Sequence, residues 1–163
     1  MLQAGIYRAI TTSIAVVSLV MTALTLQARA EDAGMKMHGE LMIEQAWIRA
    51  APAGAPVAGG YLTITNKGQK ADRLVSVSAG FAAMSEIHEM AMEGDVMKMR
   101  PVDGGLVIEP GATVELKPGG FHLMFMKPKS QVKDGESYPV TLQFENAGAF
   151  ELEIPVGKSA PHH

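Results

Sequence analysis

Residues 121–126, FHLMFM, place one histidine and two methionines at every second position. Successive side chains of a β-strand point to opposite faces, so His122, Met124 and Met126 are expected to share one face. The other three residues, two phenylalanines and a leucine, would share the opposite face and pack into a core. Methionine alone could fill gaps in a core, because its thioether side chain is flexible. The histidine indicates that this face could instead bind a ligand.

A second histidine, His88, lies in similar surroundings. Met90 and Met92 follow it at alternate positions and would share its strand face. Met97 and Met99 would share one face of the next strand along the chain. These two strands and the strand that contains the FHLMFM run could bring two imidazoles and several thioethers together at one end of the domain.

The softness of these donors indicates which metal such a cluster would hold. A thioether is a soft, neutral donor that favours Cu(I), and imidazole binds copper in either oxidation state. Calcium and magnesium prefer oxygen ligands, and structural zinc sites usually contain thiolates. The 163-residue chain has 12 methionines and no cysteine, so a blue-copper centre, which needs a thiolate, is excluded. The cluster therefore points to Cu(I), with Ag(I) as a mimic, although the same residues could be ordinary core or surface groups.

The sequence contains none of the common catalytic motifs. It has no cysteine nucleophile, no G-x-S-x-G elbow, no H-E-x-x-H helix and no glycine-rich phosphate loop. Glu86 and Glu89 would point to opposite faces of their strand and are expected to be solvated surface groups. The formal net charge of −3 gives no support for a nucleic-acid surface. We therefore expect a binding protein without catalytic residues or an organic cofactor.

Short apolar runs separated by turn residues dominate the chain and are typical of strands. Ten strands are expected, at 41–49, 59–66, 72–78, 84–92, 96–101, 105–109, 112–116, 121–127, 138–146 and 149–155. The EGD sequence at 93–95 is typical of a hairpin loop, KPGG at 117–120 of a turn, and the proline-rich stretch 50–60 of a surface loop. Trp47, the only tryptophan, is expected to anchor the core. The pattern predicts one all-β domain with Greek-key connectivity.

The first thirty residues have the pattern of a secretory signal peptide. Arg8 supplies the positive charge, an apolar stretch follows, and Ala28 and Ala30 stand at the −3 and −1 positions of a cleavage site. The apolar run is short for a membrane anchor, so we expect cleavage after Ala30, export to the periplasm and no membrane span in the mature chain. The expected organisation is a signal peptide at 1–30, a flexible lead-in at 31–40, the β domain at 41–156 and a disordered tail at 157–163.

The span from His88 to Met124 resembles the periplasmic copper chaperone family called PCuAC, also known as DUF461. The family pattern is a histidine, ten residues, a methionine, about twenty-one residues and then H-x-M. Here ten residues separate His88 from Met99, twenty-two separate Met99 from His122, and HLM at 122–124 supplies H-x-M. Three longer stretches also resemble the family: AWIRAAPAGAPVAGGYLTITNKG, IHEMAMEGDVMKMRPV and VELKPGGFHLMFM. The resemblance covers nearly the whole expected β domain.

The resemblance implies a cupredoxin-like Greek-key β-barrel or sandwich that binds Cu(I) in the periplasm. It also implies delivery to the copper centre of cytochrome c oxidase subunit II, directly or with Sco-type copper proteins. The implied ligands are His88, Met99, His122 and Met124. The remaining methionines nearby would tune access or assist transfer, namely Met90, Met92, Met97 and Met126. The protein would be a monomeric metallochaperone, not an enzyme, with the copper ion and these copper proteins as its partners and no nucleic acid.

Two questions stay open from the sequence alone. The extra residue between Met99 and His122 leaves Met97 as a competing ligand. The function also has alternatives, because the same site could serve copper storage or resistance without a delivery partner. The domain could also be a metal-free Ig-like interaction module, which would tolerate loss of His88.

The ends of the chain carry the other three histidines, His38, His162 and His163. Together with the methionines of the MKMH sequence at 35–38, they could form an auxiliary Cu(II) site. None of the three lies on a predicted strand, so no rigid scaffold is expected to hold them.

Overall fold

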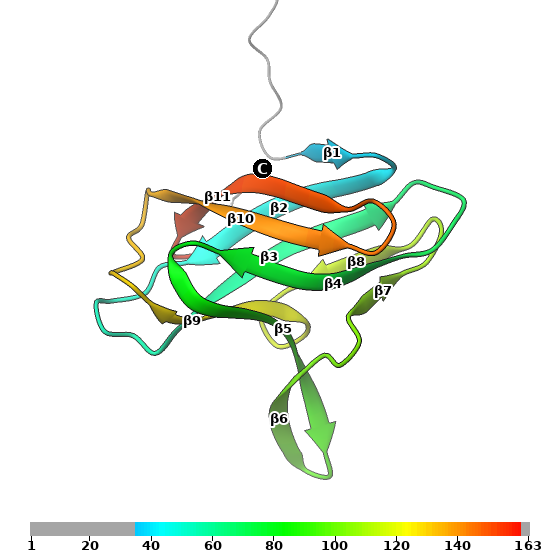
Figure 1. Cartoon of the computed structure of the whole chain (residues 1–163). Coiled ribbons are helices and arrows are strands. Elements are labelled where there is room, and N and C mark those ends of the chain that lie inside the picture. Colours follow the sequence, from blue (N-terminus) through cyan, green and yellow to red (C-terminus); the bar gives the residue numbers. More distant parts are fainter. Residues whose placement is uncertain (1–34, 161–163) are drawn as a thin grey trace, which may run out of the picture. The chain divides into compact units, whose positions relative to one another are not determined.

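The computed structural model describes residues 35–160, and Figure 1 shows how its strands are arranged. Every regular element within this range is a strand. The strands are β1 Lys36–His38, β2 Leu41–Arg49, β3 Val57–Asn66, β4 Asp72–Ala79, β5 Ala82–Glu93, β6 Val96–Pro101, β7 Leu106–Ile108, β8 Thr113–Leu116, β9 His122–Pro128, β10 Ser137–Phe144 and β11 Ala149–Gly157. All ten predicted strands are present, with ends that differ from the prediction by no more than two residues. The all-β class is confirmed.

The strands neighbour one another in the order β6-β5-β9-β3-β2-β11-β10-β4-β7, with β1 beside β2 and β8 beside β3. All of these pairs are antiparallel except β11 with β2, which is parallel. Strands that are distant in sequence become neighbours, as β9 does between β5 and β3, which gives Greek-key connectivity. In Figure 1, β4, β10 and β11 lie over β2 and β3, so the strands form two layers. The predicted Greek-key sandwich is confirmed.

One hydrophobic core lies between the two layers. Ile64 of β3 belongs to it on one side, and Leu74, Leu142 and Ile154 belong to it from β4, β10 and β11. All four side chains are fully buried. Because a domain without cysteine has no disulfides, burial of apolar surface in this core is its main source of stability.

The faces of β9 are as the sequence predicts. Leu123 and Phe125 are completely buried in the core. His122, Met124 and Met126 therefore lie on the opposite face of the sheet. This outer face of β9 carries the candidate site.

Two glycines of β3 shape the neighbourhood of β9. A Cβ atom on Gly60 would lie 2.6 Å from Cε2 of Phe125, and one on Gly59 would lie 2.7 Å from the hydroxyl of Tyr61. Because neither residue has a side chain, Phe125 can pack beneath β3 and Tyr61 can fold over Gly59. Gly59 is paired with Met124 of β9, so Tyr61 comes to lie beside the candidate site.

Trp47 is buried, but it does not anchor the main core as the sequence suggested. The pairing of β2 with β3 shifts register between Glu44 and Trp47, and Gln45 in this gap has φ 53°. The bulge adds one residue to β2, so Ile48 faces the core and Trp47 faces the other side. There it packs on Tyr61, with ring centroids 4.7 Å apart. Strict alternation cannot reveal a bulge, so this prediction was wrong.

The start of the domain also differs from the prediction. The strand Lys36–His38 lies within the stretch 31–40 that was expected to be flexible, and it pairs with β2. His38 anchors it, because its Nε2–H donates to the carbonyl of Ala147 at 2.9 Å and its ring stacks on Phe150 with centroids 4.6 Å apart. The expectation that His38 has no rigid scaffold was therefore wrong. The predicted signal peptide lies outside the described residues.

Two other strands extend into segments predicted as irregular. β3 begins at Val57, inside the proline-rich stretch 50–60 expected to be a loop. β11 runs to Gly157, the first residue of the tail expected to be disordered. Both extensions are held by pairing with a neighbouring strand, Val57 with Met126 and Gly157 with Arg49, which the local side-chain pattern does not reveal.

The carboxylate of Asp72 ties the start of β4 to the turn between β10 and β11. It is 8% exposed and accepts backbone N–H bonds from Arg73 at 2.7 Å and from Asn146 and Ala147 at 2.9 Å. Desolvation by burial is the largest single influence on its pKa and raises it. The N–H donors of Asn146, Arg73 and Ala147 together outweigh burial, so the pKa of Asp72 is lowered from its ordinary value.

We predict that Asp72→Asn lowers the free energy of unfolding at neutral pH by about 1–3 kcal/mol, because an amide leaves buried donors poorly paired. The lowered pKa means that the wild-type advantage is complete above the ordinary aspartate range and is lost as pH falls through the folded-state pKa. Urea denaturation at pH about 7 and about 3 measures the difference. Asp134→Asn is the control, since that carboxylate is exposed and its one ion pair within residues 35–160 is with Lys158 at 3.5 Å. Equal stability of the two variants at neutral pH would contradict the role of Asp72.

Candidate metal centre

Two histidines of the domain, His88 and His122, lie directly opposite each other on neighbouring strands. His88 of β5 pairs with His122 of β9, and their ring centroids are 5.9 Å apart. Each residue is only 8% exposed. The sequence predicted that these strands would bring the imidazoles together, and the register confirms it.

Each imidazole has one ring nitrogen engaged and the other free. Nε2–H of His88 donates to Oε2 of Glu86 at 2.7 Å, and Nδ1–H of His122 donates to the carbonyl of Gly120 at 3.1 Å. Because these acceptors cannot donate, they fix opposite tautomers and leave lone pairs on Nδ1 of His88 and Nε2 of His122. Nδ1 of His88 is buried and has no hydrogen-bond partner among the described residues. Metal-binding histidines commonly have this arrangement, in which a second partner orients the ring.

Glu86 therefore has a role that sequence reasoning missed. We expected it to be a solvated surface group, and instead its carboxylate contacts the ring of His88. The alternation of β5 does place the two residues on one face, so a signal was present in the sequence. Glu89 lies on the face opposite to Glu86, as expected. It is not simply solvated, because its carboxylate pairs with Arg100 at 2.7 Å.

The thioethers of the β5–β6 hairpin begin two residue pairs beyond His88, at the next pair on the same face. Met90 is opposite Met99, and Met92 is opposite Met97 further along the hairpin. Residues two apart on a strand are separated by about 7 Å. Met99 is therefore closer than Met97 to His88 by one such step. Met90 is also close to His88, on the same strand.

Met124 and Met126 of β9 also lie at different distances from the imidazoles. Met124 is two residues from His122 and is opposite Glu86 on β5. Met126 is two residues further and is opposite Met84, away from the imidazoles.

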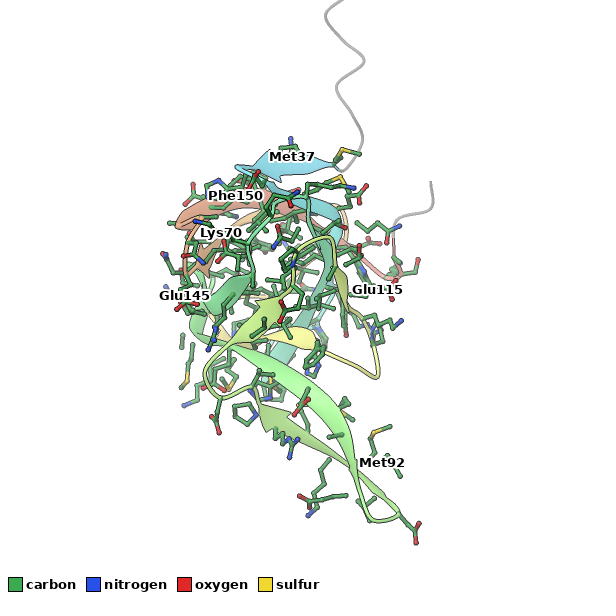
Figure 2. All side chains as sticks on the ribbon, turned by 90° about the vertical axis from the view of Figure 1, so that its right-hand side faces the viewer. Met37, Lys70, Met92, Glu115, Glu145 and Phe150 are labelled. Atoms are coloured by element: carbon green, nitrogen blue, oxygen red, sulfur yellow. The ribbon has the colours of Figure 1, made fainter. Side chains whose placement is uncertain are left out.

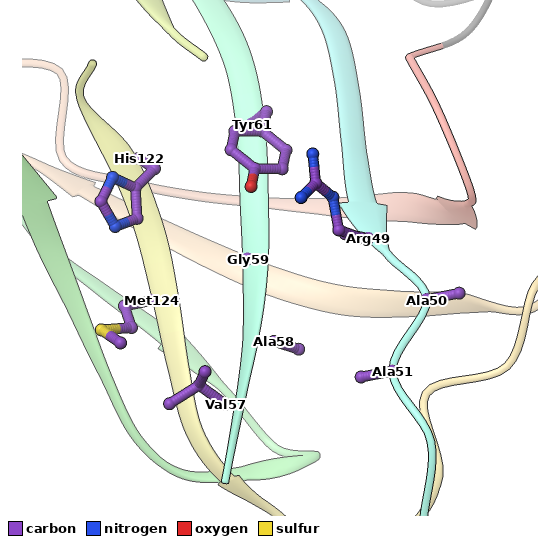
Figure 3. A pocket seen from close by; sticks show the side chains of 9 residues that line it. All are labelled: Arg49, Ala50, Ala51, Val57, Ala58, Gly59, Tyr61, His122 and Met124. Atoms are coloured by element: carbon purple, nitrogen blue, oxygen red, sulfur yellow. The ribbon is translucent and has the colours of Figure 1, made fainter. Parts of the chain in front are cut away.

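A cavity of about 230 Å³ adjoins His122 and Met124. Figure 3 shows both side chains on β9, with Tyr61 and Arg49 on the neighbouring strands. The guanidinium of Arg49 lies 5.5 Å from the ring centroid of Tyr61, within the range of a cation–π contact. Neither Arg49 nor Tyr61 was singled out from the sequence. The bulge in β2 determines that Arg49 reaches this face, and Tyr61 reaches it from β3.

The donor set of this face excludes most biological metals. Within residues 35–160, no group of three or more histidine, cysteine, aspartate or glutamate side chains is arranged to hold a metal ion. A site here must therefore use thioethers besides the two imidazoles. Neutral nitrogen and sulfur donors fit Cu(I) and do not fit calcium or magnesium, which require oxygen ligands.

The model of a protein family described as "Putative lipoprotein LpqE-like" matches residues 41–156. The chain belongs to this LpqE-like family, also called PCuAC or DUF461. A relative from Leifsonia xyli subsp. xyli, "Putative lipoprotein Lxx21020", is 29% identical over 149 residues, which are 91% of this chain and 88% of that protein. The family resemblance inferred from the sequence is confirmed.

Solved structures of PCuAC domains share the fold. The copper-bound PCuAC domain from PmoF2 superimposes with a TM-score of 0.65 at 23% identity, covering 78% of this chain and 100% of that one. The solution structure of CuI-DR1885 from Deinococcus radiodurans gives a TM-score of 0.59 at 24% identity, covering 83% of this chain and 87% of that one. These PCuAC neighbours confirm the all-β, cupredoxin-like fold of the domain.

Of the three histidines expected to form an auxiliary site, the structure describes only His38, and its contacts give no support for such a site. His38 has its ring stacked on Phe150 and its Nε2 engaged by Ala147. His162 and His163 lie outside the described residues.

We predict that the apo protein at pH about 8 holds His88 as the Nε2–H tautomer and His122 as the Nδ1–H tautomer. Long-range ¹H–¹⁵N correlation spectra of the imidazoles distinguish the two forms. In Glu86→Ala, His88 loses its acceptor and is expected to become a mixture of tautomers. His122 keeps the carbonyl of Gly120 and serves as an internal control. An unchanged His88 spectrum in Glu86→Ala would contradict the orienting role of Glu86.

Proposed function

We propose that the protein binds one Cu(I) ion through His88, Met99, His122 and Met124 and delivers it to another copper protein in the periplasm. One observation carries the proposal. Two adjacent imidazoles, each with an orienting partner and a free lone pair, lie next to several thioethers and away from any thiolate. That combination suits a soft, monovalent copper ion.

Family membership supports the same class of function. PCuAC domains are copper chaperones and not enzymes. Two of the structural neighbours are described as copper-bound or as a CuI form. Cu(I) as the ion of this chain follows from its own donor set, in which no donor is a hard oxygen except Glu86, which is occupied with His88.

The register favours Met99 over Met97 as the hairpin ligand. Met99 belongs to the second residue pair beyond His88, which is the next pair on that face, and Met97 belongs to the fourth. A methionine side chain has three rotatable bonds and can reach back toward the imidazoles from the nearer position. On the other side of the imidazole pair, Met124 is the nearer of the two β9 methionines by the same reasoning.

Such a site would combine two buried, oriented imidazole ligands with an exposed thioether ligand. Both histidines are buried and oriented by hydrogen bonds, whereas Met99 is 47% exposed on a hairpin strand. An acceptor protein could displace the exposed thioether first and the buried imidazoles afterwards. Stepwise displacement permits tight binding together with release, which delivery requires.

Export to the periplasm is part of the proposal, with residues 1–30 as a signal peptide cleaved after Ala30. The lipoprotein family name fits an exported protein. None of the described residues forms a helix with the length and apolar character needed to cross a bilayer.

The proposed receivers are the copper centre of cytochrome c oxidase subunit II and Sco-type copper proteins, by the family resemblance. The physical argument for them is donor strength. Thiolates bind Cu(I) more strongly than neutral thioethers, so copper moves from this site toward a thiolate-containing acceptor.

We predict that anaerobic titration against a chromophoric Cu(I) chelator finds one tight Cu(I), and that Met124→Leu weakens it at least tenfold, a loss of about 1.4 kcal/mol. Met126→Leu is the matched control, with a change of less than about threefold. Leucine keeps the volume and apolarity of methionine, so both variants should keep the stability of the wild type. X-ray absorption should find sulfur in the first shell. Equal losses of Cu(I) affinity in the two variants would contradict the assignment of Met124, and not Met126, as the ligand from β9.

We further predict that the Cu(I)-loaded protein transfers its ion to the copper-free soluble domain of oxidase subunit II on mixing. Copper distribution after rapid separation of the two proteins measures the transfer. As a control, the two proteins are separated by a dialysis membrane, which should slow the transfer strongly if protein contact is required. Retention of copper against an acceptor of higher affinity would refute delivery and favour storage.

A further inference from the structure

The β5–β6 hairpin has two chemically distinct faces beyond His88. On one face, Glu89 pairs with Arg100 and Glu93 with Lys98. These pairs link the two strands side chain to side chain and neutralise their charges. On the other face are four methionines in two opposite pairs, Met90 with Met99 and Met92 with Met97. A two-residue loop, in which Gly94 has φ 63°, closes the hairpin.

The methionines of this hairpin are not core residues. Met92 is 60% exposed and Met97 is 50% exposed. Among the described strands, β6 pairs with β5 alone, so one edge of the hairpin has no neighbour. Figure 2 shows Met92 on the hairpin, at the opposite end of the domain from Met37. Filling a gap in the core, the common reason for methionine, does not apply here.

We propose that Met90, Met92 and Met97 form a second site for a soft monovalent cation, Cu(I) in function and Ag(I) as its mimic, held by thioethers alone. Residues opposite each other in an antiparallel pair have Cβ atoms about 4.5–5.5 Å apart, so the sulfur atoms of Met92 and Met97 can meet at one ion. Met90 lies about 7 Å along the strand and can supply a third sulfur from its flexible side chain.

The surroundings of this thioether site select against other ions. The nearby carboxylates of Glu89 and Glu93 belong to the opposite face and are already paired with cations. On the methionine face of these two strands, a divalent metal would find neutral sulfur, which binds hard ions poorly. The pair of Met92 and Met97 lies four residue pairs beyond His88, and the pair of Met90 and Met99 lies midway between them on the same face. The thioether site therefore adjoins the imidazole site.

This site needs only the hairpin and does not require the imidazole site. Its existence and the proposed function can therefore be tested separately. His88→Asn combined with His122→Asn removes both imidazoles of the first site and leaves every hairpin methionine in place.

The experiment uses the protein with ¹³C-labelled methionine methyl groups, titrated with up to two equivalents of Ag(I), which is redox-inert. The first equivalent should shift the methyl signals of Met99 and Met124, and the second those of Met90, Met92 and Met97. Native mass spectrometry should count two bound ions. Combined Met92→Leu and Met97→Leu should weaken the second ion at least tenfold and leave the first unchanged.

Met35→Leu combined with Met37→Leu is the matched control, because these methionines are also exposed but lie on or next to β1. This variant should keep both ions. The hairpin site is overturned if the methyl signals of Met92 and Met97 stay in place during the second equivalent, or if their replacement leaves two ions bound. In the double histidine variant, the hairpin signals should still shift. If they shift there while wild-type Met124 never responds, the hairpin site stands and the imidazole site fails.

Discussion

The pairing of His88 with His122 across β5 and β9 is the constraint on which the rest of the site depends. Opposite residues of an antiparallel sheet point to one face, so this single register places both imidazoles together. A slip by one residue would turn the histidines into the core and expose Leu123. Ile87 is opposite Leu123 one step along, and both are buried, which makes such a slip costly. The hydrophobic core beneath the sheet therefore specifies the polar pair above it.

The same sheet divides the donors into a rigid group and an adaptable group. The imidazoles are buried, and Glu86 and Gly120 decide which ring nitrogen is free. The thioethers of the β5–β6 hairpin are exposed, and their side chains have several rotatable bonds. A metal ion would thus meet fixed nitrogen atoms on one side and mobile sulfur atoms on the other. Because the imidazoles are already oriented, little conformational entropy would be lost when they bind the ion. The flexible thioethers could be displaced by an acceptor protein, which would release the ion.

The fold was largely predictable because alternation is a local property of the sequence. The faces of β9 and all ten expected strands could be inferred from the period of two. What could not be inferred is pairing between distant strands. The bulge at Gln45 places Trp47 on the face opposite to the one that alternation predicts. The strand β1 is stabilised by contacts with β2 and Phe150, which the local sequence does not reveal. In the site, alternation placed Glu86 beside His88, but nothing in the sequence showed that its carboxylate reaches the ring.

Because the sequence contains no cysteine, the proposed site has imidazole and thioether as its donors. In an oxidising compartment, a thiol is readily consumed as a disulfide, whereas imidazole and thioether persist. Neutral donors also leave the positive charge of Cu(I) uncompensated, so they bind Cu(I) less tightly than thiolates do. Burial of His88 and His122 offsets part of that weakness by excluding water and fixing the free lone pairs. In the proposed function, such a site would hold copper against free solution and yield it to a thiolate acceptor, so the chemistry of the donors would determine the direction of transfer.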